Sequence, residues 1–135
     1  MVCESSLPIY MIPLEGTDSA KFSEKTVDEI MNLNTKCASL FANLISHLII
    51  TCDDLVLHDP VAAFFLIDPS SFHYKLMRVD VEYNKTAMNY AQTICDFNGM
   101  TNKEKNVHVC YKLNAENFWK EMHSIIKEAS DNSPL

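Results

Sequence analysis

Residues 57–72 read "LHDPVAAFFLIDPSSF", an apolar run between two Asp-Pro pairs. Asp59-Pro60 is typical of a helix start, because a carboxylate accepts hydrogen bonds from free amides and proline fits the first turn. Val61 to Ile67 carries no polar side chain, which predicts a short, buried helix. His58-Asp59 has two interpretations. It is either a helix cap beside a partly buried histidine or an acid–base pair at a chemical site.

The residues before this stretch predict one strand and two helices. "LPIYMIPL" (7–14) is an apolar run bounded by prolines and predicts a buried strand, and "EGTDSAKFSEKT" (15–26) predicts a loop. A helix over about 24–33 follows, with Ser23 or a Thr26–Glu29 capping box at its start. From Thr35, apolar side chains recur every three or four residues, which predicts an amphipathic helix ending at Asp53-Asp54.

The residues after it predict three strands and a last helix. "RVDVEYN" (78–84) alternates, with Val79, Val81 and Tyr83 on one face; "YAQTICDFNG" (90–99) predicts a strand leading to a turn at Gly99; "VHVCYKLN" (107–114) alternates again. An apolar stripe predicts a helix from about Asn114. One strand, three helices, three strands and a helix indicate an α/β or α+β class.

The first strand stands alone before three largely apolar helices, which need a larger sheet to cover them. We therefore expect residues 1–135 to form a single partial domain that belongs to something bigger.

Composition excludes several classes of function. The formal charge is −7 and Arg78 is the only arginine, which argues against a nucleic-acid partner. The apolar run 40–52 falls short of the roughly 20 residues that cross a bilayer, so no membrane span is expected. Five scattered cysteines predict reduced thiols in the cytoplasm.

The remaining polar residues give weaker signals. His47, His73, His108 and His123 are interpreted as structural or solvated, and Asp53-Asp54 as a solvated helix end. No spacing of His and Cys is typical of zinc. Calcium takes six to eight oxygen ligands, of which Asp59 supplies one or two.

Five segments in order carry a resemblance to a known family: "LPIYMIPLEGTDSAKFSEKTVDEI", "LHDPVAAFFLIDPSSF", "RVDVEYN", "QTICDFNG" and "VHVCYKLNAENFWKEM". Together they resemble the carboxyl-terminal part of the inosine–uridine-preferring nucleoside hydrolases. The strand pair with Asp80 and Glu82 on one strand and Thr93 and Asp96 on the other supports the match. The resemblance implies a Rossmann-like fold with a mostly parallel sheet.

The resemblance also implies chemistry. Family members cleave the N-glycosidic bond of ribonucleosides such as inosine or uridine, giving base and ribose, with the help of calcium. By resemblance, Asp59 matches a calcium-ligating aspartate, and His58 matches a histidine that protonates the leaving base. Imidazole suits that role because it titrates near neutral pH.

The family's Asp-x-Asp-x-x-x-Asp-Asp metal box does not occur in these 135 residues, nor does its mid-chain Asn/Glu/Asn group for ribose. We therefore expect weak calcium binding and little or no activity from this chain alone. The alternative is a non-catalytic fragment or interaction module that binds a full-length family member, since relatives assemble as homo-oligomers.

Overall fold

The computed structural model describes residues 2–51 and 55–131. The elements run in chain order as η1 (Val2–Glu4), β1 (Tyr10–Met11), α1 (Leu14–Thr17), η2 (Asp18–Ala20), α2 (Glu24–Met31), α3 (Lys36–Thr51), α4 (His58–Ile67), η3 (Pro69–Ser71), β2 (Phe72–Val81), β3 (Thr93–Asp96), β4 (Val107–Leu113) and α5 (Ala115–Asp131). The α/β class is confirmed.

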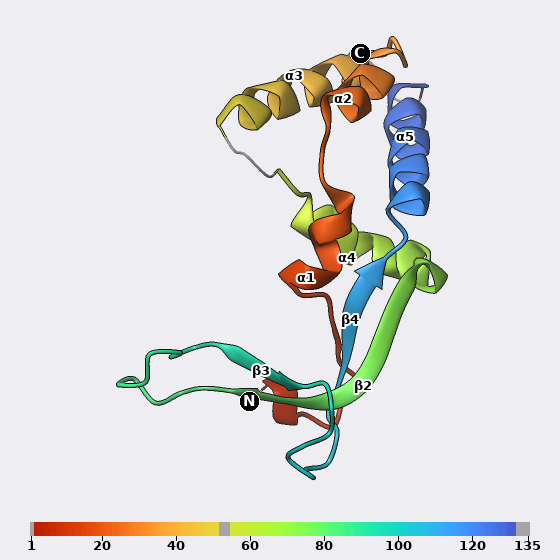
Figure 1. Cartoon of the computed structure of the whole chain (residues 1–135). Coiled ribbons are helices and arrows are strands. Elements are labelled where there is room, and N and C mark those ends of the chain that lie inside the picture. The colour runs from red at the N-terminus through yellow and green to blue at the C-terminus, as the bar shows by residue number, and fades with distance from the viewer. Residues whose placement is uncertain (1, 52–54, 132–135) are drawn as a thin grey trace.

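The molecule is extended, with the sheet at one end and a helical group at the other. Helices α2, α3 and α5 form the helical group, and α1 and α4 lie between it and the sheet (Figure 1). The β2–β3 hairpin projects sideways from the sheet (Figure 1). No helix in residues 2–51 and 55–131 combines the length and apolar character needed to cross a membrane.

The four strands lie in the order β1-β4-β2-β3. β1 pairs with β4 in parallel, with Tyr10 opposite His108, whereas β2 runs antiparallel to both β4 and β3. The mostly parallel sheet that the resemblance implies is therefore not what this chain supplies. The strands β2, β3 and β4 follow one another without an intervening helix, and such connections give antiparallel pairs.

The first strand is shorter than predicted. Two residues, Tyr10 and Met11, pair in place of the expected 7–14, and one further bond runs from the His108 amide to the Ile9 carbonyl, at 2.9 Å. Pro8 and Pro13 bound this stretch, and proline has no amide hydrogen to donate to a neighbouring strand.

The predicted loop 15–26 contains a turn of helix, α1, and the short η2. Helix α2 begins after Ser23, whose hydroxyl accepts a 3.2 Å hydrogen bond from the Thr26 amide. Of the two caps predicted from the sequence, Ser23 and the Thr26–Glu29 capping box, the structure shows the Ser23 cap. The predicted end of α3 at Asp53-Asp54 lies outside the described residues.

Helix α4 departs from the expectation in two ways. It begins at His58, with Leu57 as the cap residue, and the Asp59 carboxylate makes no capping hydrogen bond. It is also not buried all round. Val61 and Phe64 are buried, but Leu66 is 84% exposed because nothing in the described chain covers its outer side.

The hairpin alternates as predicted only at its base. Val79 is buried, but Val81 is exposed and Tyr83 lies beyond the end of β2. No layer packs over the outer part of the hairpin (Figure 1), so the apolar face of the pattern has nothing to be buried against.

Three apolar clusters hold the chain together. The central cluster, around Val61, Phe64, Phe72 and Phe118, joins α4, β2 and α5. The helical cluster, around Ile30, Ala38, Ala42 and Ile126, joins α2, α3 and α5. The sheet cluster is Met77, Val79, Val107 and Val109.

Candidate functional site

The site forms where α1 meets the amino-terminal end of α4 (Figure 1). After β1, Pro13 turns the chain and its carbonyl accepts a 2.9 Å bond from the Gly16 amide. This single turn ends at Thr17, whose side chain is 1% exposed. The turn therefore delivers one buried hydroxyl to the start of α4.

Gly16 lets the turn approach the sheet. A Cβ atom at this position would lie 3.1 Å from both the carbonyl oxygen and the sulfur of Cys110 on β4. Most Cβ contacts are longer than that, so a glycine is what fits here. The position of Thr17 is thus set by direct contact between α1 and a central strand.

Thr17 contacts His58 across 41 residues of sequence. Its Oγ1 lies 2.8 Å from His58 Nδ1 and 2.9 Å from the Leu14 carbonyl oxygen. His58 occupies the first position of α4, and the residue is exposed. One ring nitrogen is therefore held by the fold, while Nε2 has no hydrogen-bond partner among the described residues.

Asp59 follows in the first turn of the same helix and is also exposed. A carboxylate at this place is favoured by the partial positive charge of the helix N-terminus. The two residues predicted from the sequence thus follow one another in the first turn of an accessible helix end.

Asp59 does not complete a metal site with the other described residues. In residues 2–51 and 55–131, no cluster of three or more His, Cys, Asp or Glu side chains has the geometry to hold a metal ion. Calcium takes six to eight oxygen ligands. The described residues therefore do not fit calcium without ligands from elsewhere.

Two carboxylates of the strand pair that supports the family resemblance, Asp80 and Asp96, lie on β2 and β3, apart from this site. Asp80 on β2 pairs with Arg78 and with Lys103, the latter at 3.0 Å. Asp96 at the end of β3 accepts hydrogen bonds from Met100 and Thr101. Both carboxylates are used to hold the hairpin and its loop, so their role in this chain is structural.

The other histidines were predicted to be structural or solvated. His108 stacks on Tyr10 with ring centroids 4.6 Å apart, and His73 lies 6.2 Å from the Tyr111 ring. Both are packing contacts in and around the sheet.

Thr17 is the site residue that the sequence did not indicate. It lies in a stretch predicted to be a loop, and its partner is 41 positions away. The one available signal was Gly16 directly before it, since the chain has only two glycines.

The chain is similar to known proteins over most of its length. Residues 1–120 match the family model described as inosine-uridine preferring nucleoside hydrolase. The sequence is 33% identical to a probable ribonucleoside hydrolase from Dictyostelium discoideum, over 93% of this chain and 40% of that protein. The chain therefore spans less than half the length of this relative.

Solved structures share the fold. A purine-preferring ribonucleoside hydrolase from Gardnerella vaginalis superimposes with a TM-score of 0.77 at 22% identity, covering 98% of this chain and 43% of that one. An inosine-uridine preferring nucleoside hydrolase from Bacillus anthracis gives 0.75 at 16% identity, covering 94% and 39%. The arrangement of elements is thus that of one part of these larger structures.

Proposed function

Because the chain belongs to the inosine-uridine preferring nucleoside hydrolase family, we propose that it carries part of the machinery for hydrolysing the N-glycosidic bond of ribonucleosides such as inosine or uridine. The observation that supports this best is the exposed His58-Asp59 pair at the start of α4, with one nitrogen of His58 anchored by Thr17. Residues 1–135 act in this proposal as one partial domain, in the cytoplasm.

His58 is proposed as the general acid. As the bond between ribose C1′ and the base nitrogen breaks, its electron pair goes to the base, and protonated His58 donates a proton from Nε2 to that base. Water adds to C1′ and loses a proton, so base and ribose are released. The exposure of His58 allows a nucleoside to reach it, and the contact with Thr17 fixes the ring.

Asp59 is proposed as one carboxylate ligand of the calcium ion that the family resemblance implies. When bound, such an ion would position the ribose hydroxyls and polarise water. The described residues do not complete its coordination shell, so the remaining ligands must come from outside this described part of the chain. For the same reason we expect the chain alone to release little or no ribose.

A chimaera tests these roles. The portion of the Dictyostelium relative that this chain does not match is joined to residues 1–135, and ribose release is measured with inosine and with a nitrophenyl riboside. His58→Ala should lower kcat for inosine by roughly 10²–10⁴-fold. It should hardly affect the nitrophenyl riboside, because that group leaves without a proton.

Asp59→Asn should slow both substrates alike, since ribose and water are common to both reactions. His73→Ala is the matched control, because His73 lies on β2 beside Tyr111 and not in the first turn of α4. Equal slowing of both substrates by His58→Ala would refute the acid role, and ribose release by the 135-residue chain alone would refute the need for a second part.

The accessible surface favours a second candidate, an interaction module for a full-length family member. This surface is 9487 Å² for a chain of 15.4 kDa, against about 7,200 Å² for a compact monomer of that mass. Mixing the chain with a purified full-length relative and measuring the mass by light scattering tests this directly. A sum of the two masses supports the module, and two separate peaks refute it.

A further inference from the structure

The contact between Thr17 and His58 determines more than the position of the ring. A hydroxyl has one proton and two lone pairs, whereas a carbonyl oxygen only accepts. Thr17 Oγ1 lies 2.9 Å from the Leu14 carbonyl, so its proton is directed there, in the local three-residue bond that a threonine in a helical turn commonly makes. Oγ1 then faces His58 with a lone pair.

A lone pair on Oγ1 requires a proton on Nδ1. The distance of 2.8 Å between Oγ1 and Nδ1 is that of a hydrogen bond, and with Oγ1 as acceptor the donor is Nδ1–H. In neutral imidazole only one nitrogen carries a proton, so Nε2 is then bare. In the charged ring both nitrogens are protonated, and the bond to Thr17 persists.

We propose that Thr17 is a positioning residue for His58: its hydroxyl accepts a hydrogen bond from Nδ1–H, which fixes the orientation of the ring and leaves Nε2 as the nitrogen available to a ligand. This rests on the proposed acid role of His58, which it makes specific to one atom. Because this hydrogen bond uses Nδ1–H, the contact with Thr17 sets which ring nitrogen faces away from the fold.

The surroundings of Thr17 make this contact well suited to the role. Thr17 is buried, and Gly16 beside it is packed against Cys110 on β4. A partner anchored on a central strand restricts an otherwise exposed imidazole at the end of a helix. The Leu14 carbonyl also accepts from the Asp18 amide, so removing the Thr17 hydroxyl deprives only His58 of its partner.

Nitrogen NMR of the 135-residue chain labelled with ¹⁵N-histidine tests the inference without any activity. At about pH 8.5, two units above the usual histidine pKa, long-range ¹H–¹⁵N correlations show which ring nitrogen is protonated. We expect His58 to carry its proton on Nδ1. Free histidine favours Nε2, and the exposed His73 serves as the internal reference.

Thr17→Val keeps the shape of the side chain without the hydroxyl and should return His58 to the Nε2–H form. Thr17→Ser should keep the Nδ1–H form. A proton on Nε2 in the unmodified chain would overturn the inference, as would an unchanged spectrum in folded Thr17→Val. The unmodified spectrum is decisive even if Thr17→Val does not fold.

The two proposals fail separately. An inactive chimaera together with Nδ1–H at His58 refutes the proposed function and leaves the role of Thr17 intact. An active chimaera that depends on His58, together with Nε2–H, refutes the role of Thr17 alone.

Discussion

At the scale of single residues, the two glycines serve different physical needs. Gly16 is buried and has no space for a side chain, because Cys110 lies where a Cβ atom would go. Gly99 has φ of +71° with open space around it. The first is required by packing and the second by backbone conformation, so the two positions should respond differently to substitution.

We expect Gly16→Val to lower the free energy of unfolding by about 1–3 kcal/mol, because three added carbons press on the backbone of a central strand that has little room to move. Urea denaturation followed by circular dichroism measures it. Gly99→Asn is the matched control, since asparagine tolerates positive φ and meets no neighbour. Equal stability of Gly16→Val and the unmodified chain would contradict the tight contact.

His58 and Asp59 could be predicted from the sequence because they are adjacent and stand before an apolar helix. Thr17 could not. Its relation to His58 depends on the packing of α1 against β4, which brings together residues 41 positions apart. Periodicity and capping rules describe neighbours within a few residues and carry no information on such a contact.

At the scale of elements, the hairpin and its loop are held by two carboxylates. Hydrogen bonds from the Thr101 hydroxyl and amide, and then from the Met100 amide, lower the pKa of Asp96 from 3.8 to about 2. Arg78 and then Lys103 lower the pKa of Asp80 to about 2. Each carboxylate thus favours the folded hairpin only while it is ionised.

The direction of the pH effect follows from the lowered pKa. With a folded-state pKa of about 2 against 3.8 for the ordinary group, Asp96 stabilises the loop fully above about pH 4 and loses this contribution as the pH falls towards 2. The amide chemical shifts of Met100 and Thr101 should therefore titrate with a midpoint of about 2.

Asp96→Asn should abolish this titration, whereas Asp80→Asn should leave its midpoint in place, because Asp80 contacts Arg78 and Lys103 instead. A midpoint near 3.8 in the unmodified chain would show that the loop does not hold Asp96 in solution.

Helices with strong local signals were predicted well, and elements that depend on distant partners were not. Helix α2 begins directly after Ser23, one of the two predicted caps. Helix α5 begins directly after Asn114, whose side-chain oxygen accepts a hydrogen bond from the Asn117 amide. Helix α4 was expected to be buried, but burial depends on what lies opposite. No element among the described residues packs against the outer side of α4.

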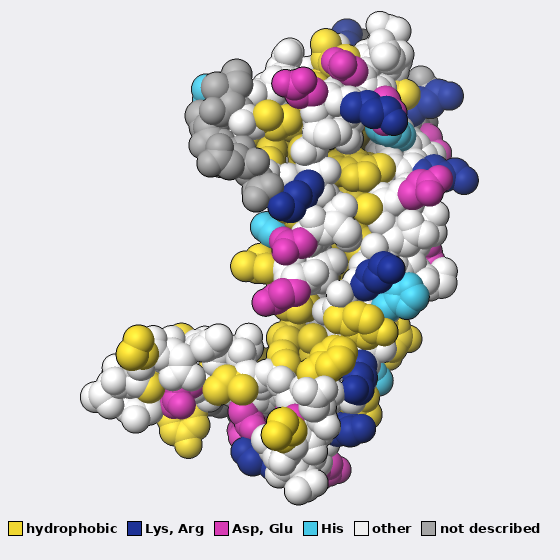
Figure 2. Space-filling model, in the orientation of Figure 1, with side chains coloured by type: hydrophobic (Ala, Val, Ile, Leu, Met, Phe, Trp, Pro, Cys, Tyr) yellow, Lys and Arg dark blue, Asp and Glu magenta, His cyan; other side chains and the backbone are white. Residues whose placement is uncertain are grey.

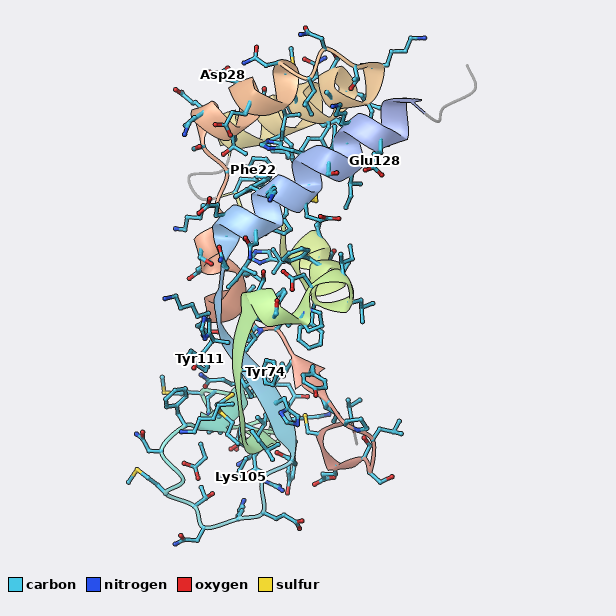
Figure 3. All side chains as sticks on the ribbon, turned by 90° about the vertical axis from the view of Figure 1, so that its right-hand side faces the viewer. Phe22, Asp28, Tyr74, Lys105, Tyr111 and Glu128 are labelled. Carbon is cyan, nitrogen blue, oxygen red and sulfur yellow. The ribbon has the colours of Figure 1, made fainter. Side chains whose placement is uncertain are left out.

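At the scale of the whole molecule, the three apolar clusters follow one another along the length of an extended structure. β4 joins the sheet cluster to the central cluster, because Val109 belongs to the first and Cys110 to the second. α5 joins the central cluster to the helical one through Met122, which packs against both. Phe22 lies at the same junction, near α5 (Figure 3). The centroid of its ring is 4.6 Å from that of Trp119.

The surface shows the same division. Apolar side chains gather where the sheet meets the helical part and along the projecting hairpin (Figure 2). The buried apolar residues of the described chain thus form three separate clusters and not one shared core. The clusters should therefore differ in stability and respond separately to substitutions.

We expect Ile30→Ala, in the helical cluster, to cost about 2–5 kcal/mol locally, because Ile30 is fully buried and the truncation leaves a cavity. Hydrogen exchange followed by mass spectrometry should then show faster exchange in α2, α3 and the second half of α5, with β2 and β4 unchanged. Met77→Ala, at an equally buried position of the sheet cluster, is the matched control and should give the opposite pattern. Phe118→Ala should quicken exchange in both regions, since Phe118 lies in the central cluster on the helix that links them. If Ile30→Ala and Met77→Ala instead quicken exchange equally throughout, the three clusters unfold as a single cooperative unit.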